Sequence, residues 1–190
     1  MAEAFGLETD LAGPAVLTET TTLYGRIVPN ADLVRDVSAR FAGTIRDVSV
    51  ALGQTVAQGQ ALATVESNES LRAYTIVAPI AGIVTARSAN PGEQTNGRVL
   101  FTIVDPSSVW AELDVFLSDR SRVRVGAEVV VTATGGVAEA IGTIAQIGVL
   151  AGRTQAVPAR VVLDNPVGLW TPGMHVSGAV EVASYEVPLA

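Results

Sequence analysis

The stretch Ala39-Arg40-Phe41-Ala42-Gly43-Thr44-Ile45 recurs, with the same order of features, as Ala78-Pro79-Ile80-Ala81-Gly82-Ile83-Val84. The same offset pairs two further positions in each copy: Gly53 with Gly92, and Val65 with Val104. Each copy therefore contains a strand, a glycine turn and a second strand. Two units this short cannot each bury a core alone, so we expect them to pair face to face in a flattened β-sandwich with quasi-twofold symmetry.

Four glycines of the repeat have distinct expected roles. Gly53 and Gly92 suit turn positions that need a positive φ, because glycine has no Cβ to clash there. Gly43 and Gly82 suit a tight bend or a close approach between two backbones. The repeat therefore predicts the turns of the sandwich as well as its strands.

The two halves are joined by Val65-Glu66-Ser67-Asn68-Glu69-Ser70-Leu71. Strand-forming residues flank a polar tip, and Ser67 or Asn68 can adopt the turn conformation. The segment is thus predicted to be an exposed hairpin loop.

After Asp105-Pro106 the pattern becomes that of a second module of short strands. Apolar and acidic residues alternate over 111–117, which is typical of a half-buried strand. Turn residues separate the strands that we expect next: Glu128–Ala133, Ala140–Ile147, Ala156–Leu163 and His175–Val182. Evenly spaced short strands indicate a small closed or Greek-key barrel, which the strand-like stretch Thr20–Val28 is expected to complete.

One short helix is predicted between these strands. Ser118 can cap its amino end, and Asp119 lies in its first turn. Arg122 and Arg124 lie in its last turn, where positive charge favours the helix dipole, and Gly126 can end it. Trp110 and Trp170 adjoin strand and turn signals and are expected to fill the barrel.

The composition excludes several classes of function. The net charge is −7 and every basic residue is an arginine, without a clustered positive face, which argues against nucleic acid as a partner. Cysteine is absent, which excludes disulfides, thiolate metal ligands and cysteine nucleophiles. Lysine is absent as well. Because an amide bond to lipoate or biotin needs a primary amine, neither prosthetic group can be attached.

The repeat resembles the lipoyl/biotinyl domain, whose prosthetic lysine lies at the tip of the hairpin that joins its halves. A lysine-free domain of this kind followed by a small barrel resembles the periplasmic adaptors, or membrane fusion proteins, of tripartite resistance–nodulation–division (RND) efflux pumps. The match is closest to adaptors of heavy-metal exporters. The residues that carry it are 41–45, 48–56, 78–84, Pro91-Gly92-Glu93, Ser108-Val109-Trp110, Asn165-Pro166, Leu169 and Thr171-Pro172-Gly173-Met174.

The resemblance implies an all-β fold: a lipoyl/biotinyl-like barrel-sandwich hybrid plus a small antiparallel β-barrel with one short helix. The expected division of the chain is a membrane-proximal fragment at 1–17, the first barrel strand at 18–35, the barrel-sandwich at 36–105, the barrel at 106–182 and a membrane-proximal return strand starting at 183–190. Typical adaptors also insert a long α-helical hairpin at the tip. Only ten residues, 66–75, join Val65 to Ile76 here, so we expect this chain to lack that hairpin.

By resemblance, the chain is a non-catalytic periplasmic adaptor subunit. It would link an inner-membrane RND-type exporter, for metal-cation efflux, to an outer-membrane channel. The resemblance also implies association of the full-length protein with the inner membrane, a homo-oligomeric ring of three or six copies in the assembled pump, and no cofactor. Two alternatives stay open: a lysine-less lipoyl-like scaffold subunit of an enzyme complex, and a soluble metal-binding chaperone.

His175 and Met174 are weak candidate metal ligands. One imidazole beside one thioether, with no cysteine and no second histidine, is a poor ligand set. The expected strand alternation directs His175 to solvent and its neighbour Val176 inward. We therefore expect a solvated or structural histidine and no metal site.

The tip of the predicted hairpin is the candidate contact with a partner subunit, because exposed loops are where such contacts concentrate. Its residues are Glu66, Ser67, Asn68, Glu69 and Ser70. The two glutamates do not form a catalytic pair, because acid–base catalysis needs a pocket that shifts a pKa, whereas a hairpin tip is open to water. No catalytic residue is expected.

Overall fold

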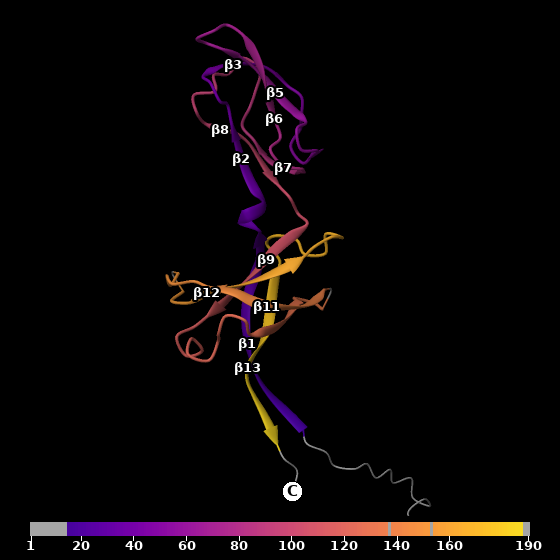
Figure 1. Ribbon diagram of the computed structural model, residues 1–190, viewed down its shortest axis with the longest axis vertical. Helices are drawn as coiled ribbons and strands as arrows, with labels where there is room; N and C mark the ends of the chain where they lie inside the picture. Colours follow the sequence, from indigo (N-terminus) through magenta and orange to yellow (C-terminus); the bar gives the residue numbers. More distant parts are fainter. Residues whose placement is uncertain (1–14, 137, 153, 188–190) are drawn as a thin grey trace, which may run out of the picture.

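The structure is a computed structural model that describes residues 15–136, 138–152 and 154–187. The described chain is elongated, with a β-sandwich at one end and a closed barrel below it (Figure 1). Strands β1 and β13, drawn in indigo and yellow, lie side by side in the wall of the barrel and continue beyond it. The fold is thus all-β with two modules, as the sequence predicts.

Within the described residues the barrel has the closed strand order β1-β13-β10-β11-β12-β9, and each neighbouring pair is antiparallel. Its strands are β1 (Ala15–Pro29), β9 (Ser108–Val115), β10 (Glu128–Ala133), β11 (Glu139–Ile147), β12 (Val157–Asp164) and β13 (His175–Val187). Alternate side chains point inward and form one apolar core, which includes Ile27, Leu113, Val129, Ile144, Val161 and Val180. Because β1 pairs with both β9 and β13, the amino-terminal strand closes the barrel, and this prediction is confirmed.

The sandwich is inserted between β1 and β9. Its strands are β2 (Val34–Ser38), β3 (Gly43–Val48), β4 (Thr55–Val56), β5 (Ala61–Ser67), β6 (Ala73–Val77), β7 (Gly82–Arg87) and β8 (Val99–Val104). They form two sheets, ordered β2-β8-β7-β4 and β3-β5-β6, around a second, separate apolar core.

Hydrogen bonds between the halves confirm the quasi-twofold relation. The N–H of Gly53 donates to the carbonyl of Val84 at 2.8 Å, and the equivalent N–H of Gly92 donates to the carbonyl of Ile45 at 2.8 Å. Both glycines have a positive φ, 80° and 87°. Each half thus supplies the turn that pairs with a strand of the other half, which is why neither is a stable unit alone.

Gly43 and Gly82 allow the close approach that the repeat predicts. A Cβ on Gly43 would lie 2.2 Å from the carbonyl oxygen of Glu66, and one on Gly82 would lie 2.5 Å from that of Val104. Any other residue would push the paired strand away, so these positions admit only glycine without a shift of the backbone.

Hydrogen bonds from the backbone and from one buried asparagine hold the connection between the two modules. After the 3₁₀ turn η2 (Ala31–Leu33), the backbone N–H of Asp105 donates to the carbonyl of Leu33 at 3.0 Å. Asn165 is buried and donates from Nδ2 to the carbonyls of Pro106 and Trp170, both at 3.0 Å. Its Oδ1 accepts the N–H of Trp170 at 2.9 Å, so one side chain joins the linker to a barrel loop.

The predicted helix at 118–126 is wrong. This segment makes successive turns, and the longest-range backbone bond within it joins the N–H of Val123 to the carbonyl of Asp119. Val123 is buried in the barrel core, whereas the side chain of Ser118 bonds to Asp119 instead of capping a helix. Caps and charges do not nucleate a helix when a single apolar residue packs inward, because helix stability depends mainly on an amphipathic face.

The β1–β13 ladder extends below the barrel, from Glu19 paired with Ala183 to Ala15 paired with Val187. The expected membrane-proximal fragments at 1–17 and 183–190 include residues 1–14 and 188–190, which lie outside the described residues. Strand β2 starts at Val34, so the sandwich begins two residues before the expected boundary at 36. Among the described residues, no helix has the length and hydropathy needed to cross a bilayer.

Candidate functional site

The hairpin tip is a tight turn organised by Ser67. This serine is buried, and its Oγ accepts the backbone N–H groups of Glu69 and Ser70, both at 3.3 Å. Its carbonyl accepts the N–H of Leu71 at 2.9 Å, which fixes Leu71 in the left-handed region at φ 55°. A short turn therefore joins the two halves of the sandwich at this end.

The tip is also tied to the opposite half of the sandwich. The N–H of Asn68 donates to the carbonyl of Ala42 at 3.0 Å, and its Nδ2 donates to Gln94 at 3.0 Å. Gln94 in turn donates to the hydroxyl of Thr44 at 2.8 Å. These bonds join the hairpin to two loops that are distant in sequence, so the whole end of the sandwich is one connected surface.

Glu66 is engaged with Arg46 across the β3–β5 pair. The guanidinium donates two hydrogen bonds to this carboxylate, at 2.6 and 3.2 Å. Through them Arg46 lowers the pKa of Glu66 below its ordinary value, and the same contact raises the pKa of Arg46. A carboxylate held ionised in this way is unsuited to donate a proton near neutral pH.

The five predicted contact residues therefore differ in their availability. Ser67 is buried and structural, Glu66 is half-buried in an ion pair, and Asn68 is bound to Gln94. Glu69 and Ser70 are exposed. Only part of the predicted tip is free to touch a partner.

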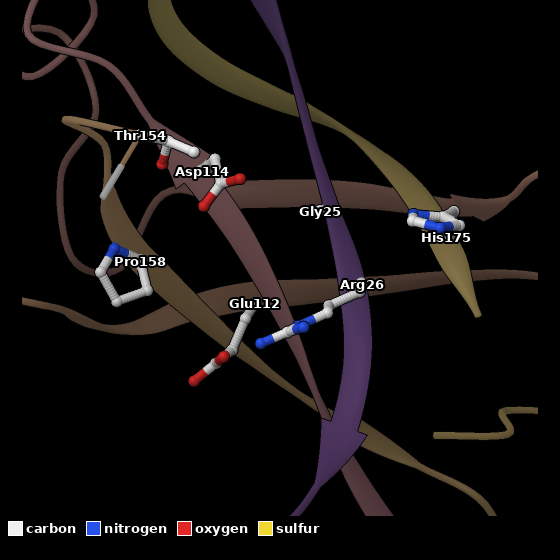
Figure 2. A pocket seen from close by; sticks show the side chains of 7 residues that line it. All are labelled: Gly25, Arg26, Glu112, Asp114, Thr154, Pro158 and His175. Atoms are coloured by element: carbon white, nitrogen blue, oxygen red, sulfur yellow. The ribbon is translucent and has the colours of Figure 1, made fainter. Parts of the chain in front are cut away.

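His175 and Met174 occupy separate environments. His175 lies on the outer face of the barrel beside a depression of about 510 Å³, which is also lined by Arg26, Glu112 and Asp114 (Figure 2). It is on the opposite side of β1 from the two carboxylates, because β1 runs between β13 and β9. The Met174 sulfur accepts the N–H of Thr171 at 3.2 Å, and its side chain packs against the barrel core.

The described residues contain no group of three or more His, Cys, Asp or Glu side chains arranged to hold a metal ion. His175 therefore belongs to no such group in this part of the chain.

Sequence reasoning missed a polar cluster on the outer face of the barrel. Arg160 donates to Glu112 at 3.0 Å, and its guanidinium carbon lies 4.6 Å from the ring centre of Trp110. Trp110 therefore faces outward, against the prediction that it fills the barrel, whereas Trp170 is buried in the core as expected. Strand alternation could have identified this, since Trp110 and Glu112 share a face opposite Val109 and Ala111.

An apolar pocket of about 300 Å³ lies at the junction of the two modules. Ile83 and Val104 line it from the sandwich, and Pro29, Val109 and Trp170 line it from the barrel. No titratable side chain is present among the described residues that line it, so it can accommodate apolar groups but offers no acid–base chemistry.

The geometry described above agrees with two known domain families. Residues 33–105 match the CzcB-like barrel-sandwich hybrid domain, and residues 108–184 match the CusB-like β-barrel domain. The chain contains one domain of each family. Between the two halves of the sandwich the described tip is a tight turn with three hydrogen bonds to Ser67, and it contains no helix.

Curated relatives agree with this placement. The chain is 33% identical over 156 residues to the cation efflux system protein CzcB of Alcaligenes sp. (strain CT14). It is equally similar to the cobalt-zinc-cadmium resistance protein CzcB of Cupriavidus metallidurans. Each match covers 81% of this chain but only 30% of the relative, so the chain spans less than a third of the length of these proteins.

A solved structure has the same fold. ZneB from Cupriavidus metallidurans aligns with a TM-score of 0.73 at 17% sequence identity, over 92% of this chain and 74% of that one. At this level of identity the match shows a shared fold and says nothing about individual residues.

Proposed function

We propose that this chain is part of a periplasmic adaptor that links an inner-membrane RND-type exporter, for metal cations, to an outer-membrane channel. The observation that carries the proposal is the order of its two modules: a lysine-free sandwich inserted into a barrel that the amino-terminal strand closes. Both relatives at 33% identity are named for cation efflux or for resistance to cobalt, zinc and cadmium.

We propose that its role is non-catalytic. A protein that connects other proteins needs shape-complementary surfaces and does not need a reactive group. One of the two carboxylates of the tip, Glu66, is paired with Arg46, which agrees with a structural use of this charged residue.

Different parts of the described chain would contact different partners of the adaptor. The hairpin tip at 66–70, with Glu69 and Ser70 exposed, would contact an outer partner. The barrel would dock on the exporter, and copies packed side by side would form a ring of three or six. The β1–β13 ladder below the barrel would be the base of a membrane-proximal domain, near the inner membrane.

Deletion of the gene in its own host tests the function. We expect the deletion strain to grow less well on cobalt, zinc or cadmium salts, and we expect the full-length gene to restore growth. Crosslinking of the full-length protein in cells should capture a large inner-membrane exporter. Unchanged tolerance to all three cations, together with no crosslink to an exporter, would remove the proposal.

A metal titration separates the adaptor from a metal-binding chaperone. Calorimetry of the chain with Zn²⁺ should give no tight site, because His175 and Met174 are not joined by further ligands among the described residues. Tight binding that is lost in His175→Ala would favour the chaperone. Copurification with a catalytic complex, and with no exporter, would favour the scaffold alternative.

A further inference from the structure

One edge strand of each sandwich sheet borders a shared groove. Strand β2 pairs only with β8, and β6 pairs only with β5 among the described strands, so each is the last strand of its sheet. The two edges line a common groove of about 370 Å³. Val37 of β2 and Ile76 of β6, which occupy equivalent positions in the two halves, are nearly buried in it.

The backbone of β6 has groups directed at this open edge. At the start of the hairpin the N–H of Ser67 donates to the carbonyl of Arg72 at 3.0 Å. In an antiparallel ladder, hydrogen-bonded and non-hydrogen-bonded pairs alternate along the strands. The N–H and C=O groups of Ala73 and Thr75 therefore point away from β5 and are available to another strand.

The two equivalent edges are protected differently. Strand β2 carries Arg35 and Asp36, and charged side chains of this kind discourage pairing at an edge. The equivalent positions of β6 hold Tyr74 and Thr75, within the sequence Ala-Tyr-Thr-Ile-Val, which has no charge and no proline. These residues have high β-propensity, so β6 is the edge that the sequence leaves open to pairing.

The rim of the groove carries one charge. Arg40 is the only charged side chain among the described residues that line it, and it takes part in none of the ion pairs formed by the described residues. Its guanidinium carbon lies 5.4 Å from the centre of the Phe41 ring. The hydroxyl of Tyr74 donates to the carbonyl of Phe41 at 2.5 Å and accepts its N–H at 3.2 Å. A strand in the groove would thus meet a positive charge at one end.

We propose that the β6 edge is a docking site for an extended strand of a partner polypeptide. The strand would pair with the backbone of Ala73 and Thr75, place apolar side chains at alternate positions in the groove, and carry a carboxylate opposite Arg40. This site goes beyond the adaptor function, because neither the order of the modules nor the hairpin tip requires an occupied edge.

The probe is a short capped peptide of alternating valine and threonine with glutamate at both ends. Its binding to the full chain is followed by shifts of the backbone amide signals in nuclear magnetic resonance spectra. We expect the signals of Ala73 and Thr75 to move with added peptide. A version with N-methylated backbone amides should not bind, because it cannot pair with an edge. Equal binding of the N-methylated peptide, or no shift at the β6 amides, would overturn the proposal.

Two variants test the contacts separately. Thr75→Pro removes an outward N–H without removing a bond to β5, and should weaken binding by about ten-fold or more relative to Thr75→Ala. Arg40→Glu, on an exposed side chain, should invert the preference between the glutamate peptide and a lysine counterpart. This charge swap stays informative if Thr75→Pro fails to fold. An unchanged preference would overturn the assigned carboxylate contact.

A second copy of the chain is the competing occupant. Pairing of β6 with β6 of another copy would give a dimer whose formation depends on concentration and is lost in Thr75→Pro. Sedimentation equilibrium is expected to show a monomer, and such a dimer would overturn the assignment to a partner polypeptide.

Discussion

At the scale of the residue, the end of the sandwich depends on Ser67. Its buried hydroxyl replaces the hydrogen bonds that two backbone N–H groups of the tip would otherwise make with water. Ser67→Ala should therefore lower the free energy of unfolding by about 0.5–1.5 kcal/mol, because the two N–H groups exchange a protein acceptor for water. Urea denaturation measures the change. The matched control is Ser70→Ala on the exposed side of the turn, and equal losses in both variants would contradict the role of Ser67.

Gly178 shows how closely the barrel core is packed. A Cβ at this position would lie 2.4 Å from Cδ1 of Leu113 and 3.0 Å from Cγ1 of Val129. Gly178→Ala should cost about 1–3 kcal/mol, because the leucine must leave its place in a close-packed interior. The control is Gly152→Ala, where the nearest atom to the added Cβ would be 3.9 Å away. Thermal unfolding of both variants tests this, and a neutral Gly178→Ala would show that the core can adjust.

At the scale of the element, the β3–β5 pair carries a pH-dependent contact. Arg46 lowers the pKa of Glu66 in the folded protein, so the unfolded state binds a proton more readily. The stabilisation is present above the unfolded pKa, near 4.3, and is lost as the pH falls through the folded value. Between about pH 6 and pH 3 the free energy of unfolding of the wild-type protein should therefore fall by more than that of the Glu66→Gln variant.

Urea denaturation at each pH gives the two curves. Glu69→Gln is the matched control, because its exposed carboxylate takes part in none of the ion pairs of the described residues. If Glu66→Gln and Glu69→Gln follow the same curve, the ion pair does not contribute to the acid dependence.

At the scale of the whole molecule, the two modules have separate apolar cores. Ile45 lies in the sandwich core and Ile144 in the barrel core, and both are almost fully buried. We expect two unfolding transitions, because domains with separate cores depart from two-state behaviour. Ile45→Val and Ile144→Val should each lower the stability of one module by about 0.5–1.5 kcal/mol. Differential scanning calorimetry should show each variant moving a different transition, and a joint shift of both would mean that the modules unfold as one unit.

How much of this protein could be predicted from its sequence depends on the range of the interactions. The repeat of glycines at a constant offset predicted the sandwich and its turns, because positive φ and close backbone approach are local demands that glycine meets. The alternation of apolar residues predicted the barrel strands, because their inward faces must be buried. The absence of lysine excluded a prosthetic group without any knowledge of the fold.

Other features were decided only by the tertiary structure. The segment at 118–126 has the caps of a helix, but the barrel accepts only Val123 and leaves the rest in turns. Trp110 faces outward, and β6 has an unpaired edge among the described strands. Both features depend on which strands pair, and the paired strands include ones distant in sequence. The hairpin tip was located from the sequence alone. Which of its residues are free for a partner was decided by contacts with Arg46 and Gln94, because side chains from other strands determine whether a polar group is bound or exposed.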